Sequence, residues 1–227
     1  MNDRRYGHQA ILMVESLSVH YGSVRALRRA SLSVAQGEVV YLVGRNGAGK
    51  TSTLHAICAM VPKAGGRVLH NGVDLARMRT HEIVRSGIAL VPSGRRTFAQ
   101  LSVRDNLALA HGQAAKLGRA GMTLEEVVAM FPRLEVVMER RAGVISGGEQ
   151  QMLKMARSLL MFSDVLLLDE PSEGLAPIIV REVASIIREC ASSGKGVLIA
   201  EQRRDFIDLV PGRKYELERG EIVKGDQ

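Results

Sequence analysis

The sequence predicts an α/β fold in which helices cover a parallel sheet, with a small antiparallel sheet near the N-terminus and an inserted helical subdomain. Three observations support this prediction. Several short apolar runs do not alternate with polar residues, which is typical of strands buried on both faces; they read "GEVVYLVG", "VLLLDE" and "GVLIAEQ". Helical patterns separate these runs, as in a parallel sheet. From about residue 95 to 143, apolar residues recur at helical spacing.

The composition limits the possible classes of protein. A chain of 227 residues fits one large domain, or one domain with an insert, and its few aromatic residues imply an aliphatic core. No uncharged apolar run approaches the roughly 18 residues of a membrane span. The N-terminus has no signal-peptide pattern and the two cysteines fit a reducing compartment, so we expect a cytoplasmic protein. The net charge of +7 comes without a basic tail or interleaved aromatic residues, so we expect no nucleic-acid partner.

The first half of the chain reads mainly as strands. The runs "ILMVESLSVHYG" and "ASLSVAQGE" partly alternate, as half-buried antiparallel strands do, and "GEVVYLVG" reads as a central parallel strand. The next run, "TSTLHAICAM", predicts a helix with Leu54, Ile57, Cys58 and Val61 on one face. An Asn-Gly pair in "GRVLHNGVDL" predicts a hairpin.

The second half alternates between strands and helices. The predicted strands are "GIALVPS", "DVLLLDE" and "GVLIAEQ", and "KYELERGEIVKG" predicts a closing hairpin. The predicted helices lie in "VRDNLALAHG", "LEEVVAMF", "GGEQQMLKMARSLLMF" and "PIIVREVASIIRECASSG". Phe131-Pro132 ends the second of these helices, and Gly194 is a suitable C-cap for the last.

A glycine-rich loop follows the first buried strand and precedes the first helix. Its sequence fits the phosphate-binding pattern G-x-x-x-x-G-K-[ST], known as the P-loop. Glycines let successive backbone N–H groups converge on phosphate oxygens, and the helix N-terminus favours the same anion. Lys50 adds a charge for the outer phosphates, and the Thr51 hydroxyl suits Mg²⁺. The alternative is a glycine-rich turn that happens to precede a lysine. The predicted nucleotide-binding residues of this loop are Gly44, Arg45, Asn46, Gly47, Ala48, Gly49, Lys50, Thr51 and Ser52.

Two acidic residues end the buried strand "VLLLDE". In a P-loop protein this position places Asp169 near the Mg²⁺ shell. Glu170 follows directly and can accept a proton from an attacking water as a general base. The alternative is a strand that ends in two solvated acids.

The segment "ISGGEQQ", Ile145–Gln151, predicts a second anion site. Ser146 and Glu149 form a capping box that starts a helix, and Gly147 and Gly148 leave backbone N–H groups bare at its N-terminus. Since Lys50 already marks a phosphate site, this one would serve another nucleotide. A head-to-tail pair of chains would bring each segment to the other's P-loop. The alternative is an ordinary capped helix.

The P-loop, "ISGGEQQ" and "VLLLDE", in this order, resemble the ATPase subunit of an ATP-binding cassette (ABC) transporter. The resemblance covers nearly the whole chain. It implies a P-loop NTPase fold, a RecA-like parallel sheet with helices, within a single domain over residues 11–227 and with the helical insert at about 95–143. It also implies ATP and Mg²⁺, with Tyr21 stacked on adenine. The loop "PSEGLAP" would touch a partner chain, and the insert would grip a membrane-spanning partner. The segment around Ser93 would join insert to core and sense the γ-phosphate.

A finer resemblance is carried by "VPSGRRTF", "FPRL", "SGGEQQML", "GLAP" and "EQ". These stretches are similar to the second ATPase of branched-chain amino-acid importers, while urea and amide importers remain an alternative. The resemblance implies two transmembrane permease subunits, either a second ABC ATPase or another copy of this chain, and indirectly a periplasmic or lipid-anchored solute-binding protein. It also implies a position on the inner face of the cell membrane.

Two residues depart from the pattern of the family. Ser93 stands where the family has glutamine or glutamate, and serine is too short to reach a metal as a longer amide would. Gln202 stands where histidine is usual; it can still hydrogen-bond a γ-phosphate but carries no charge. Arg203-Arg204 after it reads as a salt-bridged surface pair or as a contact to an acidic neighbour. We therefore weigh an importer ATPase against a non-transport ABC ATPase acting on nucleic acid or ribosomes, and against a degenerate cassette without turnover.

Overall fold

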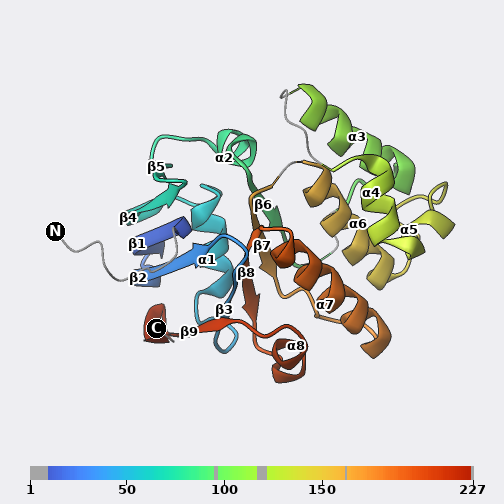
Figure 1. Ribbon diagram of the computed structural model, residues 1–227. Helices are drawn as coiled ribbons and strands as arrows, with labels where there is room; N and C mark the ends of the chain where they lie inside the picture. The colour runs from blue at the N-terminus through green and yellow to red at the C-terminus, as the bar shows by residue number, and fades with distance from the viewer. Residues whose placement is uncertain (1–9, 95–96, 117–121, 162, 226–227) are drawn as a thin grey trace.

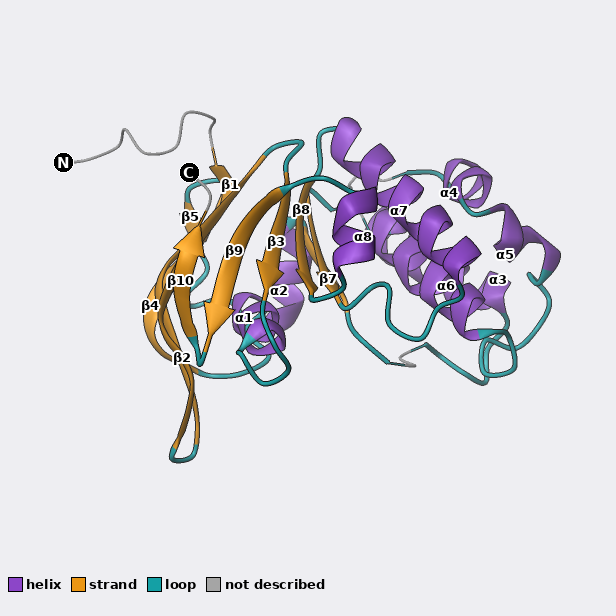
Figure 2. Ribbon diagram, turned by 90° about the horizontal axis from the view of Figure 1, so that it is seen from below, coloured by secondary structure: helices purple, strands orange, loops and turns teal. Residues whose placement is uncertain are grey.

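The computed structural model describes residues 10–94, 97–116, 122–161 and 163–225. Two sheets stand side by side, and most helices cover the outer face of the larger one (Figures 1 and 2). The smaller sheet has four strands in the order β2-β1-β4-β5, and the larger has six in the order β10-β9-β3-β8-β7-β6. This is the α/β arrangement that the sequence predicts.

The four-stranded sheet is antiparallel and forms the N-terminal side of the molecule. Its strands are β1 (Ala10–Tyr21), β2 (Val24–Ala35), β4 (Lys63–His70) and β5 (Val73–Asp74). The strand β1 pairs antiparallel with both β2 and β4. Asn71 and Gly72 join β4 to β5 with φ angles of 49° and 78°. Positive φ at both turn residues is what a two-residue hairpin requires, so the Asn-Gly prediction is confirmed.

The six-stranded sheet is parallel at its centre. Its strands are β3 (Val39–Val43), β6 (Ile88–Val91), β7 (Val165–Asp169), β8 (Gly196–Glu201), β9 (Arg213–Glu218) and β10 (Glu221–Gly225). Every residue of β7 and β8 is buried, as their unbroken apolar runs predict. In the parallel register Val43 pairs with Glu201, and Ala200 pairs with Asp169. The carboxyl ends of β3, β7 and β8 therefore meet at one edge of the sheet.

Eight helices lie among the described residues. They are α1 (Lys50–Ile57), α2 (Thr80–Ser86), α3 (Val103–Lys116), α4 (Leu124–Met130), α5 (Pro132–Val136), α6 (Gly147–Leu160), α7 (Pro177–Ser192) and α8 (Arg204–Leu209). The helix α1 packs between the two sheets, in a core that takes Val40 and Leu42 from β3. The helices α3 to α8 share a second core with Val39 and Tyr41, which point to the other face of the same strand. Successive side chains of β3 point to opposite faces of the sheet, so this strand contributes to both cores.

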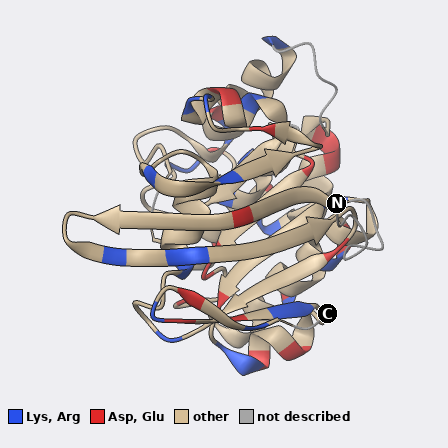
Figure 3. Cartoon of the chain, turned by 90° about the vertical axis from the view of Figure 1, so that its left-hand side faces the viewer, with Lys and Arg blue, Asp and Glu red and all other residues tan. Residues whose placement is uncertain are grey.

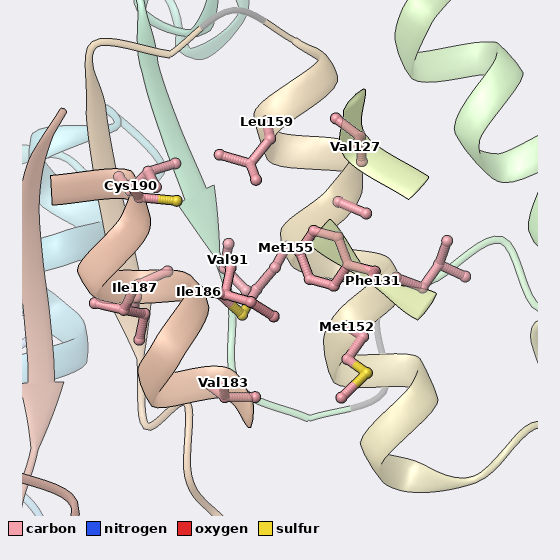
Figure 4. Close-up of a cluster of buried hydrophobic side chains, with 14 of the residues drawn as sticks. Val91, Val127, Phe131, Met152, Met155, Leu159, Val183, Ile186, Ile187 and Cys190 are labelled. Carbon is pink, nitrogen blue, oxygen red and sulfur yellow. The ribbon is translucent and has the colours of Figure 1, made fainter. Parts of the chain in front are cut away.

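The second core joins the helical region to the sheet without a break. Figure 4 shows Met152 and Met155 of α6 facing Val183 and Ile186 of α7, with Phe131 beside them. The helix α6 also packs against α3, α4 and α5. The predicted insert, about 95–143, holds α3, α4 and α5, while residues 95–96 and 117–121 lie outside the described residues. The packing therefore groups α6 with the insert.

Some boundaries differ from the predictions. The first helix stops at Ile57, with Cys58 as its C-cap, so Val61 lies beyond the helix although it packs against the same core. The short helices α2, α5 and α8 are not predicted at all. The helix α7 ends at Ser192, and Gly194 follows its cap with a φ of 92°, which agrees with the predicted helix stop.

The C-terminal hairpin supports the glycine-rich loop. The strand β9 pairs parallel with β3, which leads into the loop. In the turn between β9 and β10, the Gly220 N–H donates to the Ala48 carbonyl at 2.9 Å, and Arg28 of β2 donates its N–H to the Gly220 carbonyl at 2.7 Å. One turn therefore links the loop to both sheets. No described helix is long and apolar enough to cross a membrane.

Candidate nucleotide-binding and hydrolysis site

The loop between β3 and α1 is shaped by glycines at positions that no other residue fits easily. Gly47 and Gly49 have φ angles of 80° and 112°, and Gly49 is the N-cap of α1. A Cβ on Gly44 would overlap the Leu217 carbonyl oxygen, and one on Gly49 would lie 2.7 Å from the Ala26 carbonyl oxygen. The loop is thus a tight backbone curl that ends at a helix N-terminus, which is the arrangement that binds phosphate.

Lys50 is the first residue of α1, and its side chain is 4% exposed. Its ammonium donates to the Gly44 carbonyl at 2.8 Å and to the Arg45 carbonyl at 3.4 Å. It also lies 3.4 Å from a carboxylate oxygen of Glu170. The lysine side chain therefore crosses the loop, and its ammonium lies between the loop carbonyls and the carboxylate that follows β7.

A hydroxyl–carboxylate cluster lies next to the lysine. The Thr51 hydroxyl lies 2.9 Å and 3.1 Å from the two carboxylate oxygens of Asp169, which is buried at the end of β7. The Ser93 hydroxyl donates to Asp169 Oδ2 at 3.1 Å. Oxygen donors of this kind suit Mg²⁺, which keeps few protein ligands and takes the rest from water and phosphate. The residues therefore fit a Mg²⁺–phosphate complex.

Ser93 is thus part of this cluster despite its short side chain. The sequence predicts a segment around Ser93 that joins the helical insert to the core, with a residue too short to reach a metal. The structure places the Ser93 hydroxyl against the carboxylate of Asp169 instead. Its contact is with the predicted metal ligand.

Glu170 leaves the strand at a sharp angle. Its φ is 47°, which is strained for a residue with a side chain, and its N–H donates to the Ala200 carbonyl of β8 at 2.9 Å. The bend keeps its carboxylate within 3.4 Å of the Lys50 ammonium. Gln202 is exposed and directly follows β8, and its N–H donates to Glu201 Oε1 at 2.8 Å. Both residues lie at the sheet edge that carries the P-loop, and their catalytic roles stay predictions.

An open pocket of about 510 Å³ lies over the P-loop, large enough for part of a nucleotide. Tyr21, at the end of β1 and 44% exposed, lines it together with Lys50, Thr51 and Glu170. The pocket wall also includes three arginines that the sequence does not single out, namely Arg25, Arg28 and Arg219. The first two belong to β2, whose basic positions appear in blue in Figure 3. Only the return of the C-terminal hairpin to the P-loop brings Arg219 here.

The predicted capping box is present at the start of α6. The Glu149 N–H donates to the Ser146 hydroxyl at 3.3 Å, and the Ser146 N–H donates to Glu149 Oε2 at 2.7 Å. Gly148 packs on α7, since a Cβ there would lie 3.0 Å from the Ile179 side chain, whereas Gly147 faces open space. Of the four predicted residues of this segment, none lines the pocket over the P-loop of the same chain.

Arg203 is engaged within the chain. Its guanidinium lies 2.5 Å from Asp205 Oδ2 and donates to the Ser172 carbonyl at 3.1 Å. Of the two interpretations of the Arg203-Arg204 pair, the structure supports the salt-bridged one for Arg203. The hydrogen bond to Ser172 connects the start of α8 with the loop that follows Glu170.

The strand–loop–helix unit and the acidic end of β7 define a P-loop nucleotide-binding protein. The family model described as ABC transporter matches residues 27–173, and the chain therefore belongs to the ABC transporter ATP-binding family.

Two relatives and one solved structure illustrate the likeness. The chain is 40% identical over 216 residues to the high-affinity branched-chain amino acid transport ATP-binding protein BraG of Pseudomonas aeruginosa, covering 95% of this chain and 92% of that protein. It is 32% identical to the lipopolysaccharide export system ATP-binding protein LptB of Escherichia coli, covering 94% and 89%. A dimeric structure of a bacterial ABC transporter cassette superposes with a TM-score of 0.83 at 19% identity, covering 95% and 98%. At that identity the superposition supports the fold alone.

Proposed function

We propose that this chain is the ATP-hydrolysing subunit of an ABC importer that energises uptake of branched-chain or related amino acids through separate permease subunits. One observation supports the hydrolytic role. Lys50, the Thr51–Asp169 pair and Glu170 lie together at the edge of the sheet where the parallel strands end. The 40% identity to BraG, against 32% to an export ATPase, favours import of this solute class. Urea or amide import remains the second candidate.

Phosphate binding, metal binding and proton transfer are assigned to different residues of the site. The backbone N–H groups of the loop and the N-terminus of α1 bind the phosphates of ATP, and Lys50 adds its charge to the outer two. The Thr51 hydroxyl and the Asp169 carboxylate would hold Mg²⁺, whose positive charge would stabilise the phosphate oxygens. Glu170 accepts the proton of the attacking water, and Gln202 donates a hydrogen bond to the γ-phosphate.

The adenosine and the second chain complete the site. Tyr21 offers an exposed aromatic ring at the pocket mouth for adenine to stack on. Because the segment from Ser146 to Glu149 lies outside this pocket, we infer that it closes on the nucleotide of another chain. That chain is a second copy in a head-to-tail dimer, or a sister ATPase. ATP favours the closed pair, and hydrolysis releases it.

The permease is proposed to bind a groove beside the helical region. The groove has a volume of about 430 Å³ and lies between α3, α6 and the strand β6. Phe98 and Leu109 line it with 51% and 46% of their surfaces exposed, so the groove offers apolar surface that a partner can cover. A permease segment that covers these side chains would place the chain on the inner face of the membrane, with a solute-binding protein on the other side.

The Glu170→Gln variant tests the hydrolytic role. Loss of the general base is expected to lower kcat by about 10²- to 10⁴-fold while ATP binding is kept. Glu135→Gln, the same substitution at an exposed position of α5, is the matched control and should hydrolyse ATP like the parent. Turnover that survives in Glu170→Gln would remove Glu170 from the mechanism. No turnover in the parent chain, even with its partners, would favour a degenerate cassette.

Capture of partners tests the transport role. Tagged Glu170→Gln protein with ATP should stay closed on its partners and bring two permease subunits and an ATPase out of native membranes. Copurified ribosomal or DNA-bound proteins instead would support the non-transport alternative. The solute-binding protein associated with the permease subunits can then be screened against leucine, valine, urea and short amides.

A further inference from the structure

Lys154 is a buried lysine on α6 that the proposed chemistry does not use. Its side chain is 7% exposed, although it lies at the floor of the groove between α3, α6 and β6. Its ammonium donates to the Pro92 carbonyl at 2.9 Å and to the Gly94 carbonyl at 2.8 Å. A buried ammonium needs such acceptors, because leaving water without them is costly. The two hydrogen bonds therefore fix both the ammonium and the backbone that carries the carbonyls.

The residue between these two carbonyls is Ser93. Its hydroxyl donates to Asp169 Oδ2, and the same carboxylate meets the Thr51 hydroxyl. Two hydroxyls thus fix the orientation of Asp169, one from the P-loop helix and one from the turn that Lys154 clasps. Gly94 has a φ of 73°, which glycine adopts easily, and the Pro92 and Gly94 carbonyls on either side of Ser93 both reach the one ammonium.

We propose that Lys154 is a positioning residue that holds the Ser93 turn against Asp169 and so couples the position of α6 to Mg²⁺ binding. The proposal rests on the role of Asp169 in the proposed function. A longer side chain at position 93 could reach toward the metal by itself, whereas serine depends on where its backbone is held. The ammonium fixes that backbone from the helix whose N-terminus carries Ser146.

The same contact connects two surfaces of the protein. The groove proposed to bind the permease includes Lys154, Pro92 and Phe98 in its wall. A segment entering the groove would press on the lysine that fixes the Ser93 turn. Movement of α6 relative to the sheet would therefore shift the Ser93 hydroxyl that bonds Asp169. The shift would change the affinity for Mg²⁺, whereas binding of the phosphates by the P-loop would stay the same.

The test compares the affinity for a fluorescent ATP analogue in Mg²⁺ and in EDTA, with every variant in the Glu170→Gln background so that the nucleotide persists. The measured quantity is the gain in affinity that Mg²⁺ provides. Loss of a residue that orients a metal ligand typically weakens metal binding by about 10- to 100-fold. Lys154→Met and Ser93→Ala are each expected to reduce the gain about tenfold and to leave the affinity in EDTA within about twofold.

Coupling between the two residues is tested by combining them. Because both act through one hydrogen bond to Asp169, the double variant should lose no more than the larger single loss. Lys154→Arg keeps a donor in place and should restore most of the gain. Lys116→Met, the same substitution at an exposed position of α3 outside the groove, should behave like the parent. Thermal unfolding of each variant without nucleotide checks that it folds, and Lys154→Gln replaces Lys154→Met if the latter does not.

The outcomes separate this inference from the function it rests on. A full Mg²⁺ gain in Lys154→Met, or a double variant whose loss is the product of the single losses, overturns the positioning role and leaves the proposed function standing. A parent protein that gains nothing from Mg²⁺ overturns the proposed metal site, and this inference falls with it. Loss in both single variants, without further loss in the double, supports the coupling.

Discussion

The two left-handed glycines of the P-loop should differ in how strongly alanine disrupts them. A left-handed backbone costs an L-residue about 1–2 kcal/mol. At Gly47, with a φ of 80°, an added methyl would meet nothing within 4 Å, so only this cost applies. At Gly49 the φ of 112° is joined by contacts of 2.7 Å to the Ala26 carbonyl oxygen and 2.8 Å to a Leu27 methyl. Overpacking of this kind adds about 1–3 kcal/mol, since the backbone carbonyl cannot easily give way.

Urea unfolding without nucleotide measures these costs. We expect the free energy of unfolding to fall by about 1–2 kcal/mol in Gly47→Ala and by about 2–5 kcal/mol in Gly49→Ala. For a chain of this size, the corresponding decreases in Tm are about 4 °C and about 10 °C. The parent chain and Gly112→Ala, at an exposed site on α3 where a methyl meets nothing within 4 Å, are the controls. Equal losses at the two P-loop glycines would refute the argument, because the steric contact at Gly49 would then contribute nothing.

Three further predictions concern the pocket and the core. Tyr21→Ala should weaken ATP binding about 5- to 150-fold in a fluorescence titration, because stacking on a base contributes about 1–3 kcal/mol, and Tyr21→Trp should keep the affinity; an unchanged affinity in the alanine variant would exclude stacking there. Tyr41→Phe should lower the free energy of unfolding by about 1 kcal/mol in urea, because the buried hydroxyl donates to the Val210 carbonyl at 2.7 Å. A stability equal to the parent would show that this bond contributes nothing. Burial raises the pKa of Cys58 to about 12 and that of Cys190 to about 11. Because the raised pKa keeps both thiols protonated at pH 8, iodoacetamide should label them slowly in the folded protein and rapidly in urea, as followed by mass spectrometry. Rapid labelling of either cysteine in the folded protein would contradict the burial.

Local patterns explain what the sequence could predict. The Asn-Gly hairpin, the capping box at Ser146 and the helix stop at Gly194 each depend on a few neighbouring residues, and each is found in the structure. The unbroken apolar runs predict the central parallel strands because both of their faces are buried. Gly47 and Gly49 of the P-loop take positive φ, a local requirement that the motif meets, although the close contacts of Gly44 and Gly49 come from distant strands.

Other features depend on contacts between distant segments. The helix α1 ends early, and Ala59 beyond it takes a φ of 51°, which no spacing of apolar residues indicates. The helix α2 has few apolar residues and is anchored by buried Ile83. The contact of Ser93 with Asp169, the hold of Lys154 on its turn and the arrival of Arg219 at the pocket join residues far apart in the chain. Sequence spacing carries no information about these pairs, so only the folded chain brings them together.

The turn at Gly220 affects how the nucleotide site comes into being during synthesis. The glycine-rich loop leaves the ribosome well before β9, which pairs with β3 beside it, and before the turn that donates to Ala48. A nascent chain can therefore carry the complete phosphate-binding motif while the strand leading into it still has an unpaired edge. The loop gains its hydrogen bond at Ala48 and its neighbouring strand only when the C-terminal hairpin has formed, so the complete site depends on that hairpin.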